Sequence, residues 1–270
     1  MVQLPKALAD PIVGIIGPEC YTTLVEDLNL GDQACLKLAL SKGLGIAIIT
    51  GGSIVKIPQI ITILKNRSTQ GLSLSSYLLE VVANVINLAY NARAGNPFST
   101  WGEMLFLTTQ NIIITLLIFA FSKQTVGGVG ALGAILAIGY MLMSPQLVNP
   151  TALASLFAGT IPLNIASKIP QIMTNYTNGS TGQLSAFAVM NYLFGSLARV
   201  FTTATELDDP LMLSGTSLGA LFNAILAGQV LYYSSAKAKA KKVGTKAKAK
   251  VAKLEKAATS SPRTRHRKRD

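Results

Sequence analysis

The sequence predicts an all-α membrane protein with seven transmembrane helices, arranged as two parallel triple-helix bundles joined by an inversion linker helix. Three observations predict this class. Half of the 270 residues are hydrophobic and only 13% are charged, the mean hydropathy is +0.43, and a segment near residue 56 recurs near residue 168. This composition argues against an ordinary soluble domain.

Seven stretches are apolar and long enough to cross the hydrocarbon of a bilayer, which is about 30 Å thick and takes about 20 residues of helix. They are 39–57, 72–92, 101–121, 126–143, 151–169, 184–205 and 211–233. The connections between them leave no room for a soluble domain. The segment before the first stretch lacks the pattern of a cleaved signal peptide, so we expect the first span to act as the targeting signal.

An internal repeat organises these stretches. The heptapeptide KIPQIIT at 56–62 recurs as KIPQIMT at 168–174, and 11 of the 18 residues from 56 to 73 are identical at an offset of 112. Three helices per copy reverse the chain direction, so a linker crossing is needed to keep the copies parallel, as in SWEET transporters. The expected parts are a luminal segment 1–38, a first repeat 39–121, a linker 122–150, a second repeat 151–233 and a basic tail 234–270.

The net positive charge comes from the tail. Residues 237–270 hold 14 Lys and Arg and two acidic residues, which accounts for the whole net charge of +12. The neutral remainder excludes a body that binds nucleic acid. Lys and Arg stay on the cytoplasmic side of a membrane, so we expect a cytoplasmic C-terminus, a luminal N-terminus and contact of the tail with anionic lipid.

A Pro-Gln pair stands at the end of the first helix of each copy, as Pro58-Gln59 and Pro170-Gln171. Proline removes a backbone hydrogen bond, so both helices should kink or end here. The pairs are candidate hinges, with the glutamine amides available to a ligand or to the released carbonyl groups. The alternative is that they only define helix ends and loop geometry.

Lys56 and Lys168 lie two residues before these prolines. A lysine near the membrane interface can carry its ammonium group to the head-group region. The two residues are candidate contacts for lipid phosphate, and simple snorkelling is the alternative.

The second helix of the first copy carries a polar stripe. Its acidic and amide residues are spaced i, i+4, i+7 and i+11 from Glu80, which places them within a sector of about 60°. Such a stripe cannot face lipid. We therefore predict a central polar cavity between the copies, lined by Glu80, Asn84, Asn87, Asn191 and Arg199. The alternative is a structural network that includes a buried Glu80–Arg199 pair.

The inventory of reactive side chains argues against an enzyme. The chain has two cysteines and one histidine, so no Cys/His metal site and no Ser/His/Asp triad can be assembled, and no cofactor is expected. Cys20 and Cys35 would face an oxidising lumen, where a disulfide is permitted; the sequence leaves open whether they pair. Trp101 is interpreted as an interfacial anchor and Glu103 as an entrance charge, and the alternative is that both are ordinary boundary residues.

Seven spans and two Pro-Gln pairs resemble the PQ-loop family, which is related to the SWEETs. Further motifs resemble, within it, the mannose-P-dolichol utilization defect family. They are CLK at 35–37, LSKGLG at 40–45, PFSTWGE at 97–103, NYTNGSTGQLS at 175–185, GSLARVF at 195–201 and DPLM at 209–212. The resemblance covers roughly 11–233, and the long basic tail departs from it.

This resemblance implies a multi-pass protein of the endoplasmic reticulum membrane. Its expected role is to let luminal glycosyltransferases use dolichol-phosphate mannose and dolichol-phosphate glucose for N-glycan precursors, GPI anchors and mannosylation. Dolichol-phosphate sugars and the glycosyltransferases are then the expected partners. The alternatives are a SWEET-like or proton-coupled small-solute transporter, in which Glu80 titrates, and a chaperone of membrane glycosyltransferases.

Overall fold

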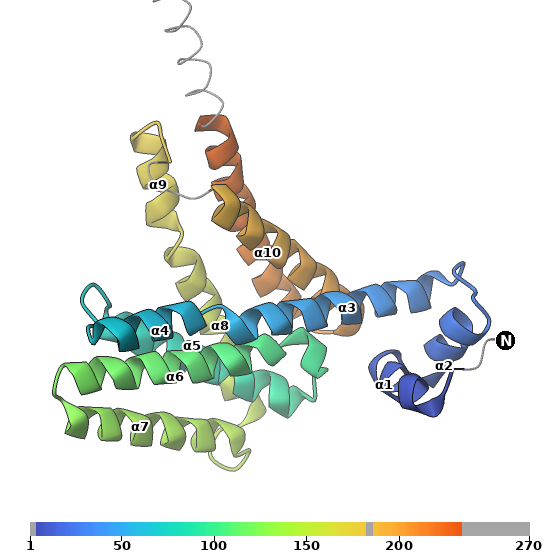
Figure 1. Ribbon diagram of the computed structural model, residues 1–270, viewed down its shortest axis with the longest axis horizontal. Coiled ribbons are helices and arrows are strands. Elements are labelled where there is room, and N and C mark those ends of the chain that lie inside the picture. Colours follow the sequence, from blue (N-terminus) through green and yellow to red (C-terminus); the bar gives the residue numbers. More distant parts are fainter. Residues whose placement is uncertain (1–3, 182–185, 234–270) are drawn as a thin grey trace, which may run out of the picture.

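The computed structural model describes residues 4–181 and 186–233, and every regular element within these ranges is helical. The predicted all-helical class is therefore confirmed for this part of the chain. A helix lies at each of the seven predicted positions. Figure 1 shows the helices of the first repeat and the linker as neighbouring rods, with those of the second repeat inclined to them.

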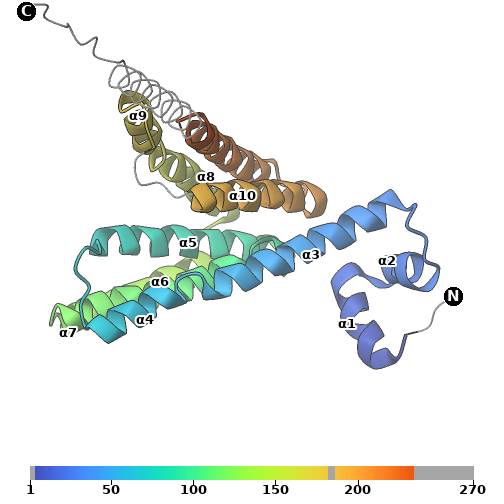
Figure 2. The ribbon, with the colours of Figure 1, turned by 45° about the horizontal axis from the view of Figure 1, so that its top comes forward.

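The chain begins with a small helical segment beside the first long helix. It comprises α1 (Lys6–Ile16), α2 (Pro18–Tyr21) and the π-helical turn η1 (Thr22–Glu26), next to the start of α3 in both views (Figures 1 and 2). A disulfide joins Cys20 to Cys35, with a Cα–Cα distance of 5.1 Å. The pairing that the sequence left open is thus formed, and it ties α2 to the beginning of α3.

The first repeat is built from α3 (Gln33–Ile54), α4 (Ile57–Asn66), α5 (Leu74–Ala94) and α6 (Gly102–Phe121), with the short η2 (Phe98–Thr100) before α6. The Asp32 carboxylate caps α3 by accepting hydrogen bonds from the backbone N–H groups of Ala34 and Cys35. The helix is interrupted after Ile54 and resumes with Pro58 in its second position, where a missing N–H costs no helical hydrogen bond. The connection expected between the stretches 39–57 and 72–92 therefore contains one more helical segment.

The linker helix α7 (Thr125–Met143) leads to the second repeat, which repeats this pattern. It contains α8 (Pro150–Ala166), α9 (Ile169–Thr177), α10 (Ala186–Glu206) and the helix Pro210–Tyr233. Pro170 occupies the second position of α9, just as Pro58 does in α4. Both copies thus break their first helix at equivalent residues.

Five helical segments are long and apolar enough to cross a membrane in the described part of the chain. They are Gln33–Asn66, Gly102–Phe121, Thr125–Met143, Pro150–Thr177 and Pro210–Tyr233. The helices α5 and α10 fall outside this set although each has 21 residues, because both carry several polar and charged side chains. A multi-pass membrane protein is supported, and the seven-span arrangement stays a prediction.

The two repeats meet through equivalent helices. Among the elements from α3 to α10, the most extensive contacts between the repeats join α3 to α10 and α5 to α8, so the first helix of each copy packs on the second helix of the other. The Tyr90 ring on α5 stacks on Phe157 of α8 with 4.3 Å between ring centroids. This reciprocal packing is what a pseudo-twofold relation between the copies requires, and Figure 2 shows α10 beside α3.

Gly45 allows the segment before α6 to approach α3 closely. A Cβ atom at this position would lie 2.5 Å from the backbone oxygen of Ser99 in η2, whereas a Cβ at Gly43, on the same helix, would meet no heavy atom within 4 Å. Contacts under 3.0 Å force the backbone to shift. The glycine therefore sets the position of Ser99, which belongs to the site between the repeats.

We expect Gly45→Ala to lower the free energy of unfolding by about 1–3 kcal/mol, the usual cost of overpacking. Thermal denaturation of the purified protein in detergent measures this effect. Gly43→Ala is the matched control, because both variants gain the same helix propensity. Equal melting temperatures for the two variants would contradict the close approach of η2.

Candidate functional site

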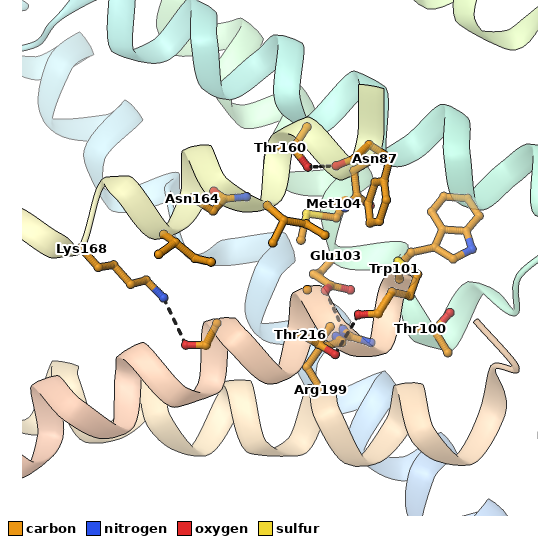
Figure 3. Close-up of a pocket in the computed structure, with 16 residues that line it drawn as sticks. Asn87, Thr100, Trp101, Glu103, Met104, Thr160, Asn164, Lys168, Arg199 and Thr216 are labelled. Carbon is orange, nitrogen blue, oxygen red and sulfur yellow. Dashed lines mark hydrogen bonds and ion pairs between the residues drawn. The ribbon is translucent and has the colours of Figure 1, made fainter. Parts of the chain in front are cut away.

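A cavity of about 160 Å³, lined by both apolar and polar side chains, lies between the two repeats. The first repeat contributes α5, η2 and α6 to its wall, and the second contributes α8, α10 and the helix Pro210–Tyr233. The polar and charged lining residues are Asn87, Thr100, Glu103, Thr160, Asn164, Lys168, Arg199 and Thr216. Figure 3 shows Glu103 and Arg199 pointing toward one another, with Lys168 at the far end of the cavity.

Glu103 and Arg199 form an ion pair across the repeats. Arg199 Nη2 lies 2.6 Å from Glu103 Oε1, and the two side chains are only 12% (Arg199) and 8% (Glu103) exposed. Arg199 Nη1 also donates a hydrogen bond of 3.1 Å to the backbone oxygen of Ser99. Within the described residues, Glu103 Oε2 is buried without a hydrogen-bond partner. The interpretation of Glu103 as an entrance charge is therefore wrong: its carboxylate lies in the wall of the cavity.

A second polar cluster joins the repeats beside this pair. Glu206 at the end of α10 accepts hydrogen bonds from Ser41 (2.5 Å), Lys42 (2.6 Å) and Ser99 (2.6 Å). Its side chain is 1% exposed. Burial alone would raise the pKa of the Glu206 carboxyl, but these hydrogen bonds and the charge of Lys42 outweigh it and hold the pKa below its usual value. The carboxylate thus fastens α10 to α3 and to η2.

The cross-repeat polar contacts gather at one end of the bundle. Besides the two clusters above, the Tyr90 hydroxyl at the end of α5 donates a hydrogen bond of 2.7 Å to Asp209, next to the start of the helix Pro210–Tyr233. The segments that follow the Pro-Gln breaks, α4 and α9, lie well apart in Figure 1. The repeats are therefore held together by charge and hydrogen bonding at the end where α5 is joined to α6.

The two lysines before the Pro-Gln pairs bind asparagines of the third helix in their own repeat. Lys56 Nζ lies 2.5 Å from Asn111 Oδ1 and 2.7 Å from Glu80 Oε1. Lys168 Nζ lies 2.8 Å from Asn223 Oδ1. Both ammonium groups are thus directed into the protein, and contact of these lysines with lipid phosphate stays a prediction.

The structure brings together some of the five predicted cavity residues. Asn87 and Arg199 line the cavity, but Glu80, Asn84 and Asn191 are not in its wall. Glu80 pairs with Lys56 instead of Arg199. Asn84 is partly buried on α5, and Asn191 is exposed on α10.

The Pro-Gln residues lie at the helix breaks. Gln59 Nε2 donates a hydrogen bond of 2.7 Å to the Tyr77 hydroxyl on α5, so this amide connects α4 to α5. Gln171 is exposed on α9. Their role as hinges stays a prediction.

Sequence reasoning did not place three charged residues that occur in one copy only at the contact between the repeats. Glu103, Lys42 and Glu206 correspond at the 112-residue offset to Gly215, Ala154 and Ala94. The repeat draws attention to residues that both copies share, and these three are not shared. Their charge was the signal that could have identified them, because charged residues inside or beside apolar helices need partners.

The described residues contain no group of three or more His, Cys, Asp or Glu that could hold a metal ion. Amides, hydroxyl groups and two cationic side chains dominate the polar part of the cavity wall. This arrangement is suited to reversible binding of a polar or anionic group rather than to nucleophilic catalysis.

We expect Glu206→Gln to lower the free energy of unfolding by about 1–3 kcal/mol at neutral pH, because a buried acceptor of three hydrogen bonds is weakened. The lowered pKa makes this contribution fully present above the ordinary glutamate pKa of about 4.3, and acidification through the lower folded-state pKa removes it. The wild-type protein should therefore lose more stability on acidification than the variant.

Thermal denaturation between neutral and acidic pH checks this expectation. Asp208→Asn is the control, since Asp208 is a carboxylate two residues away that is not buried. Parallel pH profiles for wild type and Glu206→Gln would count against the proposed charge contact.

Comparison with known proteins identifies the type of repeat that the two copies contain. The model of the PQ-loop repeat matches residues 40–100 and 153–212, which fall within the two copies related by the 112-residue offset. The human protein solute carrier family 66 member 3 is 26% identical over 155 residues, which is 57% of this chain and 75% of that protein. No solved structure matches the chain. The chain therefore contains two PQ-loop repeats, one in each copy, and is similar over part of its length to a human member of solute carrier family 66.

Proposed function

We propose that this chain is a transporter-like, non-enzymatic membrane protein whose cavity between the repeats binds the polar head of its ligand. The observation that carries the proposal is the Glu103–Arg199 ion pair in the cavity wall, since each charge comes from a different repeat. A ligand that binds Arg199 in place of Glu103 would break this contact and so change how the repeats are held together. Such differential contact is what couples binding to a conformational change.

The proposed ligand is dolichol-phosphate mannose or dolichol-phosphate glucose. The sequence motifs that resemble the mannose-P-dolichol utilization defect family support this choice. The chemistry of the cavity agrees with it: Arg199 and Lys168 supply positive charge for a phosphate, and Asn87 and Asn164 supply amides for sugar hydroxyl groups. Luminal glycosyltransferases would then receive the lipid-linked sugar.

The proposed location is the endoplasmic reticulum membrane, with the N-terminus in the lumen and the basic tail in the cytoplasm. The Cys20–Cys35 disulfide supports this orientation, because disulfides persist in oxidising compartments. The 14 basic residues of 237–270 support a cytoplasmic tail.

An apolar groove adjoins the cavity and offers a place for the hydrocarbon chain. It has a volume of about 430 Å³, and α5, α6 and α7 form it. Trp101 lines both spaces, and its indole N–H donates a hydrogen bond of 2.9 Å to the Asn96 carbonyl. A ligand with its anionic head in the cavity and its polyprenyl chain in the groove would thus contact Trp101 with both parts.

Scrambling of dolichol-phosphate mannose by the purified protein in liposomes tests the proposal. We expect the wild type to move the lipid between leaflets. Arg199→Gln should reduce the rate by about thirtyfold or more, since truncating one member of a buried charge pair costs about 2–5 kcal/mol of binding. Arg67→Gln, at an exposed position after α4, is the control.

A deletion strain gives an independent check. Its lipid-linked oligosaccharides should stop before the luminal mannose additions while dolichol-phosphate mannose is still made. Full-length precursors in that strain would refute the proposed role.

The groove makes a separate prediction. A Cβ at Gly139 would meet its nearest heavy atom, Val85 Cγ1, at 3.9 Å, so Gly139→Phe should project into the groove without a backbone clash. We expect this variant to slow scrambling of the full-length lipid by about tenfold and to leave binding of a two-isoprene analogue unchanged, because only the long chain needs the groove.

Gly130→Phe is the matched control. Gly130 lies nine residues earlier on α7, about 180° around the helix, and a Cβ at this position would meet no heavy atom within 4 Å. Equal rates for the two variants would remove the groove from the pathway.

A small-solute transporter is the second candidate. The similarity to solute carrier family 66 member 3 favours it. Uptake of labelled sugars or amino acids into proteoliposomes, abolished by Glu80→Gln, would select this function in place of lipid handling.

A further inference from the structure

Each repeat contains the same pair of a lysine and an asparagine. Lys56 binds Asn111 in the first copy, and Lys168 binds Asn223 in the second, with Nζ–Oδ1 distances of 2.5 and 2.8 Å. Both lysines and both asparagines are related by the offset of 112 residues. The duplication has therefore preserved both the residues and their hydrogen bond.

The positive charge of the first copy is neutralised within the protein. Lys56 Nζ makes an ion pair with Glu80 on α5 and lies 5.3 Å from the centre of the Tyr77 ring. A carboxylate and an aromatic face are both favourable partners for an ammonium group. The first repeat therefore supplies the counter-charge of its own lysine, the Glu80 carboxylate.

The second copy lacks both of these partners. At the 112-residue offset, Glu80 corresponds to Tyr192 and Tyr77 to Val189. Among residues 4–181 and 186–233, no carboxylate lies within 4.0 Å of Lys168 Nζ. Its remaining contact is a long one, 3.4 Å to the Gly219 carbonyl.

The position of this second pair adds the decisive observation. Lys168 and Gly219 line the cavity between the repeats, and Figure 3 shows the Lys168 side chain directed toward the helix Pro210–Tyr233. Lys56 is not part of that wall. A cation in a membrane-spanning segment is stabilised by an opposite charge, and here the open space beside it is where a ligand can supply one.

We propose that the Lys168–Asn223 pair binds a phosphate group of the ligand, and that Glu80 is the permanent internal counterpart of that phosphate in the first repeat. This inference rests on the proposed role of the cavity as the ligand site. Asn223 accepts from Lys168 and donates a hydrogen bond of 3.2 Å to the Tyr192 carbonyl, so it holds the ammonium group in place. A Lys ammonium is a point charge suited to a phosphate oxygen.

The geometry also identifies the substitution that imitates the first repeat. The backbone carbonyl of Tyr192 accepts a hydrogen bond from Asn223, so position 192 lies next to the pair. Glu80, which corresponds to Tyr192 in the first repeat, forms an ion pair with Lys56. Tyr192→Glu should therefore place a carboxylate beside Lys168 and occupy the phosphate site. Tyr192→Gln removes the same aromatic ring without adding charge, and it is the matched control.

Binding can be followed by the fluorescence of Trp101, which is the one tryptophan in the sequence and lines the same cavity. The probes are dolichyl phosphate in phosphatidylcholine liposomes, and inorganic phosphate or mannose 1-phosphate in solution. We expect Tyr192→Glu and Lys168→Met to weaken phosphate binding by about tenfold or more. Tyr192→Gln and Glu80→Gln should bind within about twofold of the wild type.

The probes separate the possible sources of phosphate. Saturable binding of dolichyl phosphate but not of the soluble probes identifies a lipid head group, and the reverse identifies a free phosphate ester. Either result supports the site if Tyr192→Glu weakens the binding by about tenfold or more. Equal binding by Tyr192→Glu and Tyr192→Gln overturns the inference. So does a wild type that binds none of the probes.

The inference and the proposed function fail in different ways. If the wild type scrambles dolichol-phosphate mannose and Tyr192→Glu does so equally well, the phosphate site is refuted while the proposed function stands. If the wild type does not scramble this lipid but binds inorganic phosphate in a manner that Tyr192→Glu removes, the site stands and the dolichol ligand is refuted.

Discussion

A charge inside a membrane protein must have a partner, and this constraint governs the packing of the two repeats. Glu103 and Glu206 are almost wholly buried, and each is met by a cation from the opposite repeat, Arg199 and Lys42 respectively. Removing one partner would leave the other charge in a medium that solvates it poorly. The repeats are therefore joined by obligatory pairs, in addition to apolar contacts that neighbouring lipid could supply equally well.

Duplication supplies the scaffold, and departures from it supply the site. The breaks before Pro58 and Pro170 and the paired lysines and asparagines are common to both copies. The residues that distinguish the copies, such as Glu103 in place of Gly215, create the charges that meet between them. A symmetric pair of bundles becomes an asymmetric cavity because a few positions diverged after the repeat was formed.

The helices and the repeat could be predicted from the sequence because both depend on local information. Apolar length identified helices near all seven positions, and the Pro-Gln pairs identified the interruptions, since proline restricts the backbone wherever it stands. The helical continuation α4 was not predicted, because Pro58 fits the first turn of a new helix as well as the end of an old one. The pairing of Glu103 with Arg199 joins residues almost a hundred positions apart, and helical periodicity carries no information about such contacts.

The disulfide between Cys20 and Cys35 has a mechanical consequence. It connects the short helices at the N-terminus to the third residue of α3, the helix that carries Lys42 and Ser41. A tilt of α3 that separates it from α10 therefore also displaces α2, which the disulfide ties to the first turn of α3. The helix α1 packs against α2 and α3. A spectroscopic label on α1 would consequently report a small rotation of α3 as a larger displacement at the N-terminal end of that helix.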